Sequence, residues 1–133
     1  MLSLFPHLLV YGFFAPTLLR MVAACTFFYM AWLHFTKRAE TAKEISIVSY
    51  ETAVWATGIF LLLEVAVGVG LFIGLYTQMA ALVGLIICFK IFWVRKNLRY
   101  LSPLSHMSYI LLAAICLSLM ATGPGAAAFD LPL

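Results

Sequence analysis

The stretch from Thr52 to Gly74 reads TAVWATGIFLLLEVAVGVGLFIG and carries a single charged residue, Glu64. A helix that crosses the hydrocarbon core of a bilayer needs roughly 20 predominantly apolar residues. This stretch is long enough, and it contains no proline that would interrupt a helix. It therefore predicts a transmembrane helix with one ionisable group near its middle.

The composition extends this interpretation to the whole chain. Of the 133 residues, 65% are hydrophobic and only 10% are charged, and the mean hydropathy is +1.09. Soluble domains are usually about 45–50% apolar and about 25% charged. A domain of this size cannot bury such an excess, because much of its surface stays exposed. We therefore expect one membrane domain over residues 1–133, with the lipid bilayer as its main partner and no role in nucleic-acid binding.

Three further apolar segments of similar length accompany the first. They cover about residues 17–35, 77–94 and 105–122. Only Leu75 and Tyr76 separate the 52–74 segment from the 77–94 segment, which predicts an antiparallel helical hairpin. The sequence thus predicts an all-α membrane protein, a bundle of four transmembrane helices.

Two other segments are expected to lie outside the spans. Residues 2–15 are apolar but short and are interrupted by Pro6. They predict a short N-terminal helix in the membrane interface, with a fifth span as the alternative. Residues 36–51 form the longest polar stretch, for which we expect a loop with a partly helical portion.

The basic residues predict the orientation of the spans. Two connections carry them: Lys37, Arg38 and Lys43 in the first, and Arg95, Lys96 and Arg99 in the second. With four spans, both connections lie on the same side of the membrane. Short loops rich in lysine and arginine stay in the cytoplasm. Both termini are therefore predicted to lie outside.

Ionisable residues within spans are costly and need a reason. Glu64 must be paired, hydrogen-bonded or protonated, since an isolated carboxylate in hydrocarbon costs several kcal/mol. Arg20, near the outer end of the first span, is the partner that we predict for it, directly or through a water molecule. Such a pair can fix the register of two helices or form part of a functional site, and both interpretations stay open.

Helical spacing places the ionisable residues of the first span on one stripe. The stripe consists of Arg20, Ala24, Phe27, Ala31, His34 and Arg38. It is expected to face the interior of the bundle, with His34 near the inner end as an interfacial hydrogen-bonding group. Arg20, His34 and Glu64 together are the candidate intramembrane polar site.

The cysteines predict no metal or redox site. Cys25, Cys88 and Cys116 are far apart in the sequence and form no C-x-x-C pair. We expect them to pack as small apolar residues. No cofactor can be assigned from the sequence.

Three patches of sequence resemble the DoxX-like family of small bacterial four-span membrane proteins. The first is Leu-Leu-Arg at residues 18–20. The second is Glu64 followed by glycines at positions 68, 70 and 74. The third and most specific is the closing segment GPGAAAFD from Gly123 to Asp130, which includes Pro124 and Gly125. We expect this closing segment to be structural and to fold back over the outer mouth of the bundle, where Asp130 could meet Arg20.

The chain also departs from the family pattern. Ala128 and Phe129 stand where the family often has serine and leucine, and His34 stands near a position that is often lysine. Residues 1–16 are unlike the usual start.

The resemblance implies a protein of a bacterial or archaeal cell membrane. It implies a small subunit or adaptor of a respiratory or redox-stress assembly, with a larger membrane or redox protein as partner. The alternative is a protein that binds a quinone or another lipid-like molecule, as an enzyme or as a carrier, in a pocket near Arg20 and Glu64. Whether the chain is an enzyme stays open.

Overall fold

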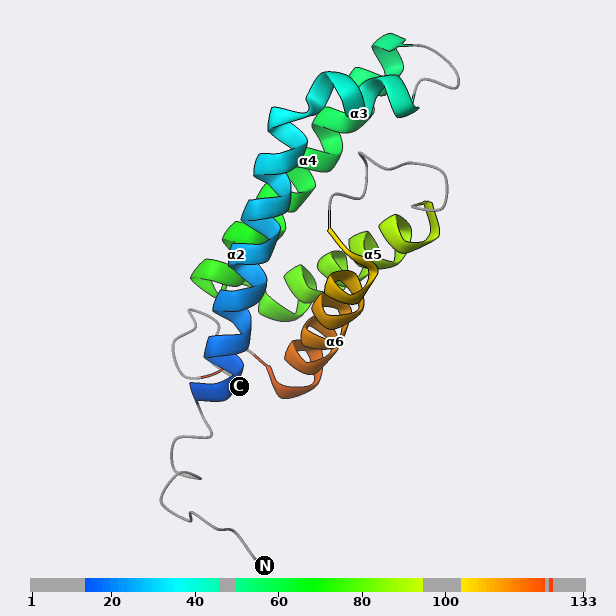
Figure 1. Cartoon of the computed structure of the whole chain (residues 1–133). Coiled ribbons are helices and arrows are strands. Elements are labelled where there is room, and N and C mark those ends of the chain that lie inside the picture. The colour runs from blue at the N-terminus through cyan, green and yellow to red at the C-terminus, as the bar shows by residue number, and fades with distance from the viewer. Residues whose placement is uncertain (1–13, 46–49, 95–103, 124, 126–133) are drawn as a thin grey trace, which may run out of the picture.

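The computed structural model describes residues 14–45, 50–94, 104–123 and 125. Five helices make up this part of the chain, and no strand occurs in it (Figure 1). They are α2 (Ala15–Thr36), α3 (Arg38–Ile45), α4 (Tyr50–Ile73), α5 (Thr77–Val94) and α6 (His106–Thr122). The all-helical class is as predicted, and each expected span coincides with one helix to within two residues. The predicted interfacial helix at residues 2–15 falls almost entirely outside the described residues.

The helix ends follow from local chemistry. Pro16 occupies the first turn of α2, where its missing N–H costs nothing. Gly74 ends α4 with a φ of 76°, and the N–H groups of Gly74 and Leu75 both donate to the Gly70 carbonyl. Tyr76 follows, and α5 begins at the residue after it. This is the tight hairpin that the sequence predicts.

The helix α6 is capped at both ends. At its start, the Ser105 hydroxyl accepts a hydrogen bond from the backbone N–H of Ser108, 3.3 Å away. At its end, Gly123 donates its N–H to the Leu119 carbonyl. The side chain of Gln78 in the first turn of α5 reaches the Met120 carbonyl in the last turn of α6, so these two helix ends lie together.

The bundle is built from two helix pairs. Helix α2 packs along α4 and α5 packs along α6, and further contacts join α4 to α5 and α2 to α6 (Figure 1). A close approach involves Gly84 of α5, where an added Cβ would lie 2.9 Å from the ring of Phe27 in α2. A small residue at this position allows a buried aromatic ring to fill the space between the helices.

Helix α3 lengthens the α2 side of the bundle. The backbone leaves α2 at Lys37 and starts again at Arg38, and α3 packs against α4. The first part of α4 therefore lies beyond the end of α2 and packs against α3 instead. Threonine hydroxyls at this junction donate to carbonyls one turn earlier, Thr36 to Trp32 and Thr41 to Lys37, which satisfies them without water.

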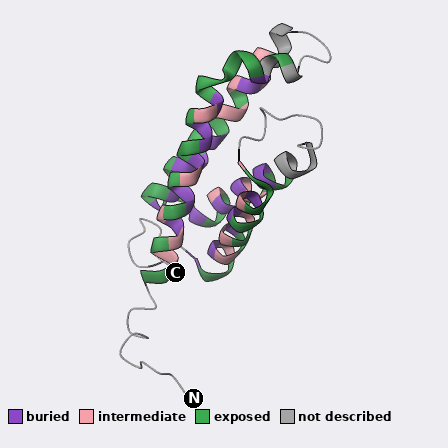
Figure 2. Cartoon of the chain, in the orientation of Figure 1, coloured by how far each residue is buried: buried purple, intermediate pink, exposed green. Residues whose placement is uncertain are grey.

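Apolar side chains cover the outside of the bundle as well as its interior. Buried residues line the contacts between the helices, and exposed ones lie on the outer faces (Figure 2). Trp55, Leu62, Ile86 and Leu111 are among many large apolar residues that are more than half exposed, which is unusual for a water-soluble protein. Two helices, Ala15–Thr36 and the Val54–Ile73 part of α4, are long and apolar enough to cross a membrane, and α5 and α6 contain shorter apolar helices.

The start of the closing segment lies against the first turn of α2. Gly125 has a φ of 78°, and a Cβ added there would lie 2.7 Å from the Thr17 hydroxyl and 3.0 Å from its backbone nitrogen. Gly123 has nearly the same φ, 77°, but open space beside it. Only glycine fits at Gly125 without both backbone strain and overlap. The rest of the predicted fold-back, from Ala126 to Asp130, lies outside the described residues, as does Pro124.

These two glycines allow a matched test. Gly123→Ala should lower the free energy of unfolding by about 1 kcal/mol through backbone strain alone. Gly125→Ala should cost clearly more, because its Cβ also collides with Thr17. Thermal unfolding in a mild detergent measures both variants side by side. Equal losses at the two positions would show that the contact with α2 contributes nothing.

Candidate functional site

The polar stripe of α2 faces the interior. Arg20, Ala24, Phe27, Ala31 and His34 are all buried, as the helical spacing predicts. Arg38, at the end of the stripe, is exposed because it lies beyond the end of α2 and starts α3. The stripe therefore brings two ionisable side chains, Arg20 and His34, into the bundle.

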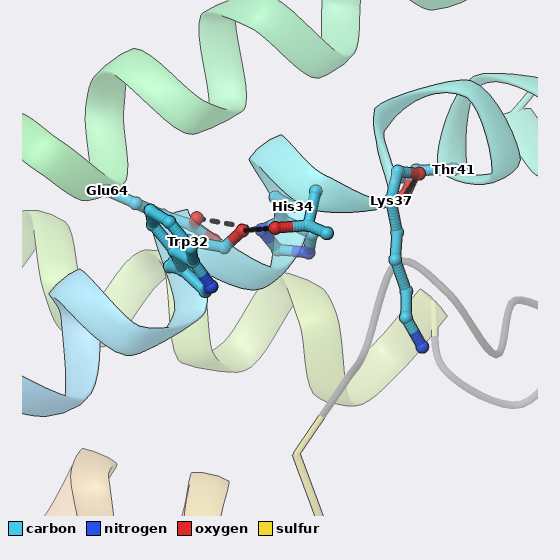
Figure 3. Close-up of polar contacts among 6 residues, drawn as sticks. Trp32, His34, Lys37, Thr41 and Glu64 are labelled. Carbon is cyan, nitrogen blue, oxygen red and sulfur yellow. Dashed lines mark hydrogen bonds and ion pairs between the residues drawn. The ribbon is translucent and has the colours of Figure 1, made fainter.

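His34 and Glu64 form a buried pair across the interface of α2 and α4. The Nδ1 atom of His34 lies 2.8 Å from Oε2 of Glu64 (Figure 3). The two side chains are only 3% and 0% exposed. Either Nδ1–H donates to the carboxylate, or a protonated carboxyl group donates to an unprotonated Nδ1. The pair can thus hold one proton between two groups of different basicity.

Glu64 finds its partner in His34, and the predicted pairing with Arg20 does not occur. Arg20 and His34 are fourteen positions apart on one helix, which corresponds to about 21 Å along its axis. An arginine side chain cannot span that distance. The depth predicted for Glu64 was wrong. The first part of α4 packs on α3, so Glu64 lies level with the last turns of α2 and not nearer the start of that helix.

The second carboxylate oxygen makes the site unusual. Oε1 of Glu64 is buried and accepts no hydrogen bond from the described residues. The space beside the neighbouring turn is closed, because the Phe28 ring lies 3.0 Å from where a Cβ of Gly68 would be. The Phe28 ring therefore fills the space next to Gly68. One oxygen of a buried carboxyl group is therefore left without a hydrogen-bond donor among the described residues.

A groove lies close to this pair on the outer side of the same two helices. It has a volume of about 350 Å³ and includes Arg38, Thr57 and Leu61 in its lining. Thr57 is almost fully buried and lies two turns before Glu64 on α4. Thr57 was not among the predicted site residues, although its spacing of seven residues from Glu64 places both on one face of the helix.

The remaining polar candidates lie elsewhere. Cys88 and Cys116 are buried within α5 and α6, and Cys25 is exposed. In the described part of the chain, no three His, Cys, Asp or Glu side chains come together as a metal site would require. Gly125 of the closing segment contacts the start of α2, which is remote along that helix from His34.

An all-helical chain with an apolar exterior and a buried acid–base pair between helices defines a small membrane protein. The DoxX family model matches residues 15–96, which is more than half of the chain and covers α2 to α5. The chain belongs to the DoxX family. The closing segment that also resembles the family lies beyond the matched region. No curated protein and no solved structure matches the chain.

The His34–Glu64 contact predicts non-additive stability. His34→Leu or Glu64→Leu alone leaves one buried polar group unpaired and should cost about 1–3 kcal/mol. The double variant should lose less than the sum of the single losses, because neither polar group remains. Thermal unfolding of the three variants in detergent measures this coupling.

The matched control combines Arg20→Met with Glu64→Leu. These two losses should add, since groups about 20 Å apart rarely couple. Coupling between Arg20 and Glu64, or its absence between His34 and Glu64, would contradict the observed arrangement.

Proposed function

We propose that this protein is a small multi-pass membrane subunit of a respiratory or redox-stress assembly. Its membership of the DoxX family supports a membrane subunit. The buried His34–Glu64 pair is the observation that supports a role in proton transfer. The pair is equipped to exchange a proton inside the membrane. The electrons would come from a larger partner protein that carries a flavin, haem or iron–sulfur group.

The proposed chemistry is proton transfer to a quinone-like molecule at the partner interface. A quinone that accepts two electrons also takes up two protons, and a carboxyl group held by a histidine can deliver one of them and be reprotonated through the imidazole. Oε1 of Glu64 is the atom available for this transfer, because it has no donor among the described residues. Since Glu64 is fully buried, delivery requires the helices to part or the partner to open the site.

A second candidate is a binder or carrier of a quinone or similar lipid, without a partner. The apolar hollow beside Phe35, Leu61 and Val65 favours it, because it lies on the outer surface near the buried pair. Glu64 is fully buried and does not line this hollow, so in this case it would orient a carbonyl or hydroxyl group of the ligand only after the helices part. Co-purification separates the two candidates, since a carrier works alone.

The proposed topology has four spans, with α2, α4, α5 and α6 crossing the membrane of a bacterium or archaeon and both termini outside. Contacts at one end of the bundle support it. Gln78 at the start of α5 meets the end of α6, and Gly125 meets the start of α2. The basic residues Lys37, Arg38 and Lys43 follow the opposite end of α2, where a cytoplasmic surface is expected.

Reporter fusions test this topology. A reporter that is active only in the cytoplasm should work when fused after Lys43 and after Arg99, and one that is active only outside should work after Asp130. The reason is the concentration of basic residues in the two cytoplasmic connections. A cytoplasmic C-terminus together with an external 37–51 segment would contradict the proposal and indicate a fifth span.

Glu64→Gln tests the function. Glutamine keeps the size of the side chain and can still hydrogen-bond to His34, but it cannot release a proton. The affinity-tagged chain, extracted in mild detergent, should retain a redox protein identified by mass spectrometry in both wild-type and variant form. Quinone reduction or quinol oxidation by the assembly should fall on the order of 100-fold in the variant.

Cys25→Ser, on the exposed face of α2, is the control and should leave the activity unchanged. Purification of a lone, stable oligomer without any redox partner would refute the subunit proposal. Full activity of the assembly with Glu64→Gln would instead leave the pair a purely structural role.

A further inference from the structure

The groove on the outer side of α2 and α4 has one cationic end and one apolar end. At the cationic end, Arg38 extends across to α4. A Cβ added to Gly58 would lie 3.8 Å from Nη2 of Arg38, so the guanidinium group lies directly over this glycine. The absence of a side chain at Gly58 leaves the space beneath the guanidinium group open as part of the groove.

The apolar end extends along α4. From Gly58 to Val65 the helix rises about 10 Å, and Leu61, Leu62 and Val65 line the groove on this side. A second hollow of about 360 Å³ shares Phe35, Leu61 and Val65 with it and continues to Trp32. The two hollows together form an apolar track that runs from Arg38 along the seam of α2 and α4.

The track opens outward, toward the surroundings of the bundle. The side chains on its two sides, Phe35 of α2 and Leu62 of α4, are 62% and 67% exposed. In a membrane protein such a surface faces lipid acyl chains. An occupant must therefore be available from the bilayer and must offer an apolar chain to the track.

The position of Arg38 indicates the other half of the occupant. It follows α2 by one residue, as the first residue of α3, at the depth where lipid phosphate groups lie if α2 spans the membrane. Lys37 precedes it, and both side chains are exposed. A guanidinium group binds phosphate through two parallel charge-assisted hydrogen bonds, and basic residues at the cytoplasmic surface attract anionic lipids.

We propose that this groove is a specific site for one anionic phospholipid. The phosphate group contacts Arg38, and one acyl chain lies along Leu61, Leu62 and Val65 into the adjoining hollow. Gly58 leaves the guanidinium group accessible from the groove, so that the phosphate group can approach Arg38 from this side. This site lies outside the buried His34–Glu64 pair and does not depend on proton transfer by that pair. A phospholipid here would occupy the hollow that the second candidate function gives to a quinone, so these two occupants are alternatives.

Two lipids with the same acyl chains test the role of the charge. Dioleoylphosphatidylglycerol and dioleoylphosphatidylcholine are titrated into the delipidated full chain in a neutral detergent, and binding is followed by native mass spectrometry and by the shift in thermal unfolding temperature. We expect the phosphatidylglycerol to bind at least about fivefold more tightly, as one well-placed cation contributes on this scale. Arg38→Gln should abolish this preference.

Two further variants separate the site from general charge effects. Lys43→Gln removes one positive charge from the same helix α3 but not from the groove, and should change the preference less than twofold. Gly58→Leu keeps Arg38 but fills the groove, and should weaken binding of phosphatidylglycerol about tenfold. Its unfolding temperature without lipid reports that the variant is folded, since the nearest atom to the new Cβ lies at an ordinary contact distance.

The proposal fails if wild-type protein binds the two lipids equally, because the groove would then accept any acyl chain by shape. It also fails if Lys43→Gln reduces the preference as much as Arg38→Gln, since this would indicate diffuse attraction. Unchanged binding in folded Gly58→Leu protein would place the lipid elsewhere.

Discussion

The structure depends on the need to satisfy one carboxyl group in an apolar helix. Glu64 cannot remain ionised and isolated at its depth without a large free-energy cost, and His34 on the neighbouring helix meets this need at 2.8 Å. The contact fixes the register of α2 against α4. In that register Phe28 lies over Gly68 and Arg38 lies over Gly58. Two glycines of α4 therefore make room for two large side chains from α2 and α3.

The same register creates two chemically different regions on one helix pair. On the inside, the His34–Glu64 pair is buried in the bundle, where a proton can be held in a low-dielectric environment. On the outside, Arg38 and the apolar residues of α4 form a groove that faces lipid. One region suits exchange of a proton and the other suits recognition of a phosphate group with an acyl chain. Lipid bound in the groove would also lie along the seam that holds the pair together.

Packing between the two helix pairs depends on small residues, as expected where lipid provides no hydrophobic driving force between helices. Gly84 admits the buried Phe27 ring, and Gly125 admits the first turn of α2. The Gly125 contact gives the resemblance of the closing segment to the DoxX family a physical basis, because a glycine there avoids both strain and overlap. Helix positions and ends could be predicted well, since long apolar runs, Pro16, Gly74 and Ser105 act locally.

The sequence by itself determined the helical class, the apolar exterior, the inward stripe of α2 and the fact that Glu64 needs a partner, because these depend on composition and on a period of 3.6 residues. It could not determine which partner Glu64 takes. That choice depends on the position of α4 relative to α2 along the helix axes. Because the first turns of α4 pack on α3, this part of α4 lies beyond the end of α2. Only the tertiary structure therefore brought His34 instead of Arg20 to the carboxylate, and placed Arg38 over Gly58 at the mouth of a groove.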